Sequence, residues 1–133
     1  MSFLLDTNTC IAVLTGRAPK VTARLRTESM SDVVLCAVVK AELIFGAHKS
    51  AKAADNLARL DAFFQPFVSI PFDDAAAEAY GRVRAHLERA GTPIGPNDLL
   101  IGAIALRHGA TVVTRNVSEF ARVSGLLVEN WEA

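Results

Sequence analysis

Three acidic residues of this chain lie beside apolar segments, where an unpaired charge is costly. Asp6 follows the apolar run FLL, Glu42 lies within AELIF, and Asp98 precedes LLIGAIAL. An ionised carboxylate in a low-dielectric environment without a partner either costs several kcal/mol or takes up a proton. If the three side chains converge, they repel one another unless a cation lies among them. Oxygen ligands with no His or Cys nearby in the sequence favour a hard divalent ion, so the pattern predicts a site for Mg²⁺ or Mn²⁺.

A metal held in this way keeps open positions for water and for phosphate oxygens. It can lower the pKa of an attacking water and offset the charge that builds on a phosphodiester during in-line attack. The chemistry that the carboxylates predict is therefore hydrolysis of a phosphodiester bond.

Each carboxylate also has a structural alternative. Asp6 can cap a helix that begins at Asn8, and Asp98 can be a first-turn acid stabilised by the helix dipole. Glu42 can form an ion pair on a helix face with a Lys, or with an Arg from elsewhere. The coincidence of three such acids at apolar junctions favours a shared site.

Short apolar segments alternate with helical periodicity along the chain, and these elements must position the acids. Strands are predicted at residues 3–5, 33–36, 67–70, 111–114 and 126–128. Helices are predicted at residues 8–16, 19–29, 37–51, 51–65 and 73–91, and from a cap at Asn97 to 107–109. Alternating elements with strands that are apolar throughout indicate an α/β fold, a parallel sheet with helices on both faces.

The carboxyl ends of parallel strands meet at one edge of such a sheet and face a common crevice. Asp6 follows the first strand, and the run Thr114, Arg115 and Asn116 follows the fourth. Glu42 and Asp98 lie near the starts of their helices. We therefore expect all of these residues to approach the same crevice.

Composition places the chain among single-domain globular proteins without a strong electric field. It has 133 residues, of which 51% are hydrophobic, and fourteen Lys and Arg balance fourteen Asp and Glu. A polyanionic partner must therefore be met by a local patch. The candidates for phosphate contact are Lys40, His48, Lys49 and Arg115, whereas three arginines of one amphipathic helix are expected to be structural: Arg82, Arg84 and Arg89.

Cysteine usage and hydropathy predict a soluble cytoplasmic protein. Cys10 and Cys36 lie in apolar surroundings without a metal-ligand spacing, so we expect buried, reduced thiols. The N-terminus has no basic region, and the longest apolar runs fall far short of the about 20 residues that span a bilayer. No contact with a membrane is expected.

Three blocks that span nearly the whole chain resemble one known family. FLLDTN (3–8), AELIFGAHKS (41–50) and GTPIGPNDLLIGAIALRHGATVVTRNVSEFARVSGLLVENW (91–131) are similar to the opening strand, the glutamate helix and the C-terminal signature of PIN-domain ribonucleases, specifically the VapC toxins. The resemblance implies a single PIN domain over residues 1–133, with a parallel sheet of four to five short strands flanked by helices.

The resemblance also assigns roles to the acids. It implies metal binding by Asp6 and Asp98 and places Glu42 in the same cluster. Many PIN domains have a fourth acid directly after the fourth strand, where this chain has Asn116 and, three residues later, Glu119. We predict that Glu119 completes the catalytic set, because its charge can reach a metal. In the alternative, Ser118 caps this turn and Glu119 is only a first-turn acid.

Residues beside the acids are expected to support the site or to contact RNA. These are Asn8, Thr114, Arg115 and Asn116. A neutral Asn116 can orient a water or offer one weak carbonyl ligand, so its expected contribution is mainly to local order.

The family implies an endoribonuclease that uses Mg²⁺, or Mn²⁺, to cut structured RNA and thereby inhibits translation. The usual substrate class is tRNA or ribosomal RNA, and the subgroup that resembles DTNTCI and GTPIGP is associated with the anticodon loop of initiator tRNA. Such toxins are homodimers neutralised by a VapB-type antitoxin, and they meet operator DNA only through that antitoxin.

Two other functions remain open from the sequence. An aspartyl-phosphate phosphatase of the haloacid-dehalogenase kind also begins with a strand that ends in Asp, but it needs a second acid two residues later, where this chain has Asn8. A PIN-like scaffold that binds RNA or a partner without cleavage is the other alternative, because Asn116 leaves the acidic cluster short of one member.

Overall fold

A computed structural model describes residues 1–133, which form a five-stranded sheet and seven α-helices. The strands are β1 (Phe3–Leu5), β2 (Val33–Cys36), β3 (Val68–Ile70), β4 (Thr111–Val113) and β5 (Val128–Glu129). The helices are α1 (Thr7–Thr15), α2 (Pro19–Thr27), α3 (Ala37–Lys49), α4 (Ala53–Phe64), α5 (Asp74–Arg89), α6 (Pro96–His108) and α7 (Val117–Phe120), and a 3₁₀ turn at Met30–Asp32 precedes β2.

All strand pairs in the sheet are parallel, and the order is β3-β2-β1-β4-β5. The central strand β1 pairs Phe3 with Val33 on one side and with Thr111 on the other. Its three residues are buried because neighbours cover both edges and both faces. The predicted parallel α/β sheet is confirmed.

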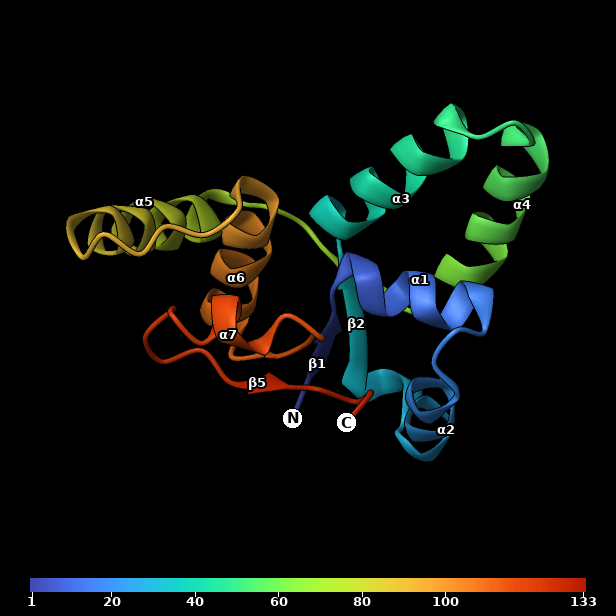
Figure 1. Ribbon diagram of the computed structural model, residues 1–133, viewed down its shortest axis with the longest axis horizontal. Coiled ribbons are helices and arrows are strands. Elements are labelled where there is room, and N and C mark those ends of the chain that lie inside the picture. Colours follow the sequence, from blue (N-terminus) through green and yellow to red (C-terminus); the bar gives the residue numbers. More distant parts are fainter.

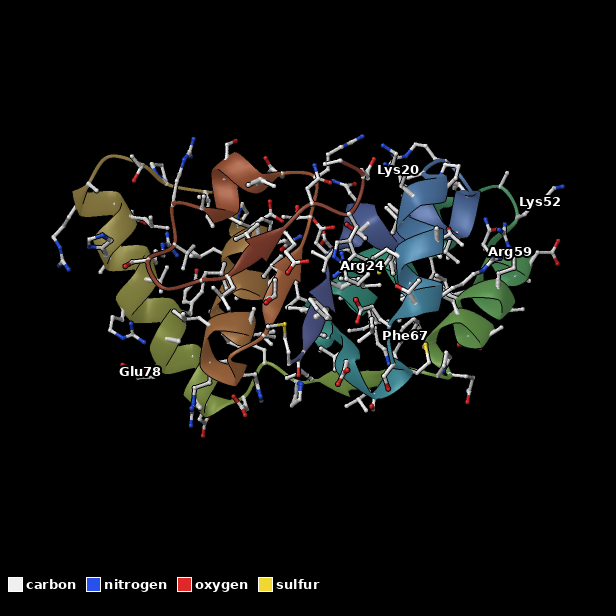
Figure 2. The ribbon with its side chains drawn as sticks, turned by 90° about the horizontal axis from the view of Figure 1, so that it is seen from below. Lys20, Arg24, Lys52, Arg59, Phe67 and Glu78 are labelled. Atoms are coloured by element: carbon white, nitrogen blue, oxygen red, sulfur yellow. The ribbon has the colours of Figure 1, made fainter.

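Helices cover the two faces of the sheet in separate groups. Figure 1 shows α1 to α4 on one side of β1 and β2 and α5 and α6 on the other, and Figure 2 shows the same division from below. The main core contains 25 buried residues around the sheet. A smaller cluster of Val83, Leu87, Leu99 and Val123 joins α5 to α6 and to the segment after α7.

Several predicted boundaries differ from the structure, and three of the differences have a clear physical reason. The helix expected to be capped by Asn97 begins at Pro96 with Gly95 as its N-cap, because a proline ring suits the first helical position. The last strand is shifted from 126–128 to Val128–Glu129, where it pairs with Val112 and Val113. The third strand is shorter than expected and not buried throughout: Val68 is 62% exposed, since β3 forms an edge of the sheet.

The carboxyl edge of the sheet is the place where the helices that carry the acids begin. The starts of α1, α3 and α6 lie together beyond this edge, opposite the two chain termini (Figure 1). Cys10 and Cys36 lie buried nearby as free thiols, as predicted, and burial is the main cause that raises the pKa of each. None of the helices has the length and apolarity needed to cross a bilayer.

Candidate active site

Asp6 connects the end of β1 to the start of α1. Its Oδ1 accepts a hydrogen bond of 2.9 Å from the Thr9 backbone N–H, so Asp6 is the N-cap of the helix. Its own backbone N–H donates to the Val113 carbonyl at 3.1 Å, and the Thr9 hydroxyl donates to the same oxygen at 3.0 Å. These two hydrogen bonds join the start of α1 to the end of β4. Asp6 is only 4% exposed, and its Oδ2 accepts no hydrogen bond from the protein.

Glu42 extends from α3 toward the beginning of α1. Its Oε1 accepts a 2.6 Å hydrogen bond from the Thr7 hydroxyl, and no Lys or Arg forms an ion pair with it. The ion-pair alternative for Glu42 is therefore wrong. Sequence reasoning missed Thr7 as a site residue, although its place directly after Asp6 was a usable signal.

The carboxyl groups of Asp98 and Glu119 both lie beside Gly95, at the start of α6. Asp98 is the third residue of α6, and Glu119 lies in the short helix α7 after β4. The Gly95 backbone N–H donates to Glu119 Oε1 at 2.5 Å, and the Asn116 side-chain amide donates to Glu119 Oε2. A Cβ on Gly95 would lie 3.4 Å from Glu119 Oε1 and 4.0 Å from Asp98 Oδ2. Gly95, which sequence reasoning also missed, contributes its backbone N–H to the Glu119 carboxylate.

The surroundings of Asp98 oppose its negative charge. Burial raises the pKa of Asp98 to about 7, helped by a hydrogen bond to Glu119 and by the charges of Glu119, Asp6 and Glu42. The Gly95 hydrogen bond, followed by those from Asp98 and Asn116 and by the charge of Arg122, lowers the pKa of Glu119. The opposite directions mean that Asp98 takes up a proton before Glu119 does as the pH falls.

The segment after β4 is arranged by Thr114. Its buried hydroxyl accepts the Asn116 backbone N–H at 2.9 Å, which fixes the turn into α7. Asn116, not Ser118, is the N-cap residue of this helix, so the proposed Ser118 cap is wrong. Asn116 is exposed and turned toward Glu119, while Arg115 and Asn8 are exposed and make no side-chain hydrogen bond or ion pair.

The structure thus places four carboxylates from four segments in one electrostatic environment. No three acidic, histidine or cysteine side chains come close enough to form a ready-made metal site. None of the four forms an ion pair of 4.0 Å or less with Lys, Arg or His. The donor set fits a hard divalent ion because all of its ligand atoms are oxygens. No ion pair balances its negative charge, and the raised pKa of Asp98 shows that this charge is costly without a cation.

Two of the lysines predicted to contact RNA lie against aromatic rings of the protein instead. Lys40 Nζ lies 4.8 Å from the centre of the Phe64 ring, and Lys49 Nζ lies 5.9 Å from that of Phe45. Such cation–π contacts hold the two lysines against their own helical hairpin, which favours a structural role for them. His48 is exposed beside them.

Comparison of the sequence with known families and proteins gives one consistent match. The PIN-domain family matches residues 3–126. The tRNA(fMet)-specific endonuclease VapC of Salmonella typhimurium is 37% identical over 131 residues, which cover 98% of each chain. Ribonuclease VapC2 of Rickettsia felis is 35% identical over 133 residues and 99% of each chain.

Comparison of the fold with solved structures gives the same family. The DNA-bound VapBC complex of Salmonella typhimurium contains a chain that superimposes with a TM-score of 0.93 at 37% identity, with 98% of each chain covered. A match of this extent includes every segment that carries a candidate site residue. The phosphatase alternative is thereby excluded.

Proposed function

The chain belongs to the VapC ribonucleases of the PIN-domain family, and we propose that it cuts tRNA at the cluster of Asp6, Glu42, Asp98 and Glu119 with Mg²⁺ as cofactor. The observation that carries this proposal is that the charges of Glu119, Asp6 and Glu42 all act on Asp98, while none of the four carboxylates forms an ion pair of 4.0 Å or less with Lys, Arg or His. We further propose that residues 1–133 act as a single PIN domain.

Asp6 and Asp98 are the residues that would hold the metal, with Mn²⁺ as a substitute for Mg²⁺. The metal, when bound, supplies a lowered pKa for the attacking water and positive charge against the phosphodiester. Asp6 has a free Oδ2 for this role, while Thr9 fixes its other oxygen. Burial and the charges of Glu119, Asp6 and Glu42 raise the pKa of Asp98, so these carboxylates lie within electrostatic reach of it.

Glu42 would orient water and accept its proton, while the ionised Glu119 would add negative charge beside the metal. Thr7 holds Glu42 by one oxygen, which leaves Oε2 free to accept. Gly95 and Asn116 hold Glu119 in its ionised form. Thr114 would act indirectly, because its hydroxyl orders the turn that carries Asn116. Asn8 and Arg115 are exposed at this edge and would contact the RNA.

The proposed substrate is initiator tRNA, cut in its anticodon loop. The support is the 37% identity over almost the whole chain to a relative named for that tRNA. Cleavage within a loop is also consistent with the general accessibility of single-stranded RNA to side chains. Inhibition of translation would follow directly.

A VapB-type antitoxin is the proposed partner, and the toxin would be a homodimer that meets operator DNA only through the antitoxin. VapBC complexes from Salmonella typhimurium and Rickettsia felis share this fold, and both were solved with DNA. An apolar groove of about 410 Å³ beside Glu42 supports a protein contact near the site. At its wall Phe45 is 66% exposed, so a protein partner seated in the groove would bury this ring.

Mapping RNA ends after brief expression of the toxin tests the substrate. Total RNA is collected within minutes of induction, and new 5′ ends are sequenced from the parent chain and from the Asp98→Asn variant. We expect ends in the anticodon loop of initiator tRNA with the parent only. Ends confined to ribosomal RNA, or the same ends with both chains, would contradict the proposal.

A further inference from the structure

A basic cavity of about 310 Å³ lies between α5 and the segment that follows α7, and none of the four carboxylates lines it. Its floor is apolar, formed by Val83, Leu87 and Val123. Its polar lining consists of Arg82, His86, Arg89, Arg122 and Ser124, and no acidic residue lines it. In a chain without net charge, this local excess of positive charge is an asymmetry that needs an explanation.

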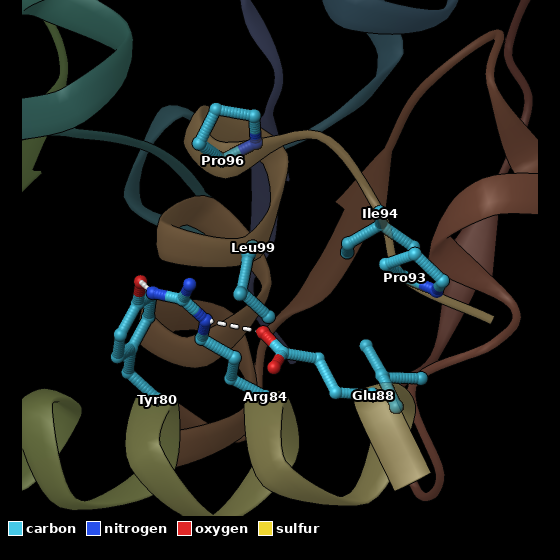
Figure 3. Close-up of a pocket in the computed structure, with 8 residues that line it drawn as sticks. Tyr80, Arg84, Glu88, Pro93, Ile94, Pro96 and Leu99 are labelled. Atoms are coloured by element: carbon cyan, nitrogen blue, oxygen red, sulfur yellow. Dashed lines mark hydrogen bonds and ion pairs between the residues drawn. The ribbon is translucent and has the colours of Figure 1, made fainter. Parts of the chain in front are cut away.

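The helix α5 separates its arginines into two groups. Arg82, His86 and Arg89 are spaced by four and three residues and so lie on one face of the helix. Arg84 belongs to the other face, where its guanidinium donates to Glu88 at 2.7 Å and to the Tyr80 hydroxyl at 2.9 Å. Figure 3 shows this second group in a different cavity, with the Arg84 side chain directed at Glu88.

The cations in the basic cavity are largely uncompensated. Arg89 and Arg122 form no ion pair, and Arg82 has only an exposed contact of 3.6 Å to Glu78. Arg122 is instead fixed by a 2.8 Å hydrogen bond to the Pro93 carbonyl. The guanidinium groups of Arg82 and Arg89 are therefore free to receive an anion without first breaking a strong internal contact.

Short connections link this cavity to the candidate active site. The Arg122 backbone N–H donates to the Glu119 carbonyl at 3.1 Å, so Arg122 lies one turn beyond Glu119. Its side chain holds Pro93, two residues before the Gly95 that donates to the Glu119 carboxylate. Arg122 and the segment from Pro93 to Gly95 thus join the basic cavity to the Glu119 carboxylate.

We propose that this cavity binds a backbone phosphate of the RNA substrate at a point remote from the scissile bond. The inference rests on the proposed ribonuclease function and adds a docking point to it. A flexible RNA strand gains affinity from such a contact without sequence specificity, because phosphate contacts fix position and orientation. The same contact helps an acidic active site hold a polyanion that its own charge repels.

Binding of a 5′-fluorescein-labelled tRNA transcript, measured by fluorescence anisotropy at several salt concentrations, tests this inference. The Asp98→Asn background keeps the RNA intact during the measurement. On it, Arg82→Gln/Arg89→Gln is compared with Lys20→Gln/Arg84→Gln. The control removes the same number of positive charges, one from α2 on the opposite side of the sheet (Figure 2) and one from the other face of α5.

We expect the cavity variant to bind about tenfold more weakly near physiological salt. Its salt slope should fall by about 0.7 to 0.9 for each phosphate that the cavity no longer neutralises. The control should change affinity by less than about twofold. Unchanged affinity and slope for the cavity variant would overturn the inference, as would an equal loss in the control. A cavity variant that binds RNA normally but loses its protein partner would also overturn it, by assigning the cavity to a protein interface.

Cleavage by the parent chain is measured in parallel with Mg²⁺. Absence of cleavage would contradict the proposed function itself. Cleavage by the parent combined with unchanged RNA binding by the cavity variant would contradict only the assignment of the cavity.

Discussion

Neutral donors hold three of the four carboxylates at the candidate site. The Thr9 backbone donates to Asp6, the Thr7 hydroxyl to Glu42, and the Gly95 backbone to Glu119. Such bonds fix the orientation of a carboxylate without cancelling its charge. A cluster oriented in this way keeps its attraction for a divalent cation, which ion pairs with Lys or Arg would have reduced.

The hydrogen bond between Thr7 and Glu42 gives a direct test of such a donor. Thr7→Val keeps the shape of the side chain but removes the hydroxyl, so Glu42 loses its orientation. We expect the cleavage rate to fall about tenfold, as is typical when a hydrogen bond to a site residue is removed. Thr7→Ser is the matched control, because it restores the hydroxyl and should restore most of the rate. Equal rates for Val and Ser variants would show that the bond has no part in catalysis.

A pair of metal titrations distinguishes the catalytic role of Glu119 from that of Asn116. Glu119→Gln removes the charge beside Asp98, so we expect a lower cleavage rate, a higher Mg²⁺ requirement, or both. Asn116→Ala removes only one donor to Glu119, and we expect a smaller change of the same kind. A titration curve unchanged by Glu119→Gln, beside one collapsed by Asn116→Ala, would show that the amide is the functional group.

The sequence is informative about residues whose signal is local. Asp6, Glu42 and Asp98 stand out because each interrupts an apolar segment, and the structure places them around one edge of the sheet. Thr7 and Gly95 gave no such signal. Their contacts join positions 35 and 24 residues apart, so only the folded chain reveals them. The Ser118 cap failed because helix α7 begins two residues earlier than that cap requires.

Helix α1 combines a structural and a chemical role in its N-cap. Asp6 satisfies the Thr9 backbone N–H at the helix start, yet its Oδ2 remains free for a metal. The two interpretations of Asp6, cap and metal ligand, are therefore compatible. Each role uses a different oxygen.

Substitution of Asp6 separates the two roles. Asn caps a helix about as well as Asp, so Asp6→Asn should change the free energy of unfolding by less than about 1 kcal/mol. Asp6→Ala should lower it by about 1 kcal/mol, because the cap is removed. We expect both variants to lose RNA cleavage. Urea unfolding monitored by circular dichroism, with a cleavage assay, checks this; an active Asp6→Asn variant would leave only the cap role.

Helix α6 carries a glycine in its buried interior that the fold does not require. A Cβ at Gly102 would meet Phe120, Val123 and Leu126 at 3.8 to 3.9 Å, which is ordinary van der Waals contact. Gly102→Ala should therefore raise the free energy of unfolding by about 0.5 to 1 kcal/mol through the lower entropy of the unfolded chain. Thermal unfolding checks the sign. A lower melting temperature would show that α6 and α7 have no room to adjust.

Whether a segment is a helix or a strand could be predicted, because apolar runs and periodicity are local in the sequence. The exposure of edge strands and the ends of elements could not be predicted in this way. Apolar runs and helical periodicity identified every strand and every long helix. The exposure of β3 depends on the order β3-β2-β1-β4-β5, which no run of residues encodes by itself. The shift of β5 follows from its pairing with β4, again a contact between distant segments.

The whole molecule separates its charges although its net charge is zero. Four carboxylates act on one another near the carboxyl edge of the sheet, and an arginine-lined cavity lies between α5 and the segment that follows α7. Composition alone excluded a strong overall field but could not show this separation, because it arises from folding. Under the two proposals above, the toxin would meet RNA through a local cationic surface and cut it at a local anionic one.

Metal dependence of RNA cleavage by the purified chain is the most direct test of the proposed carboxylate site. Cleavage of initiator tRNA is followed while Mg²⁺ is titrated into protein freed of metal with EDTA, for the parent and for Asp98→Asn. Asn retains the size of Asp98 but carries no charge, so a folded variant is expected. We predict no cleavage by the parent without metal, recovery on addition of Mg²⁺, and no recovery with Asp98→Asn at any concentration. Full cleavage in thoroughly chelated buffer, or a variant as active as the parent, would contradict the proposed site.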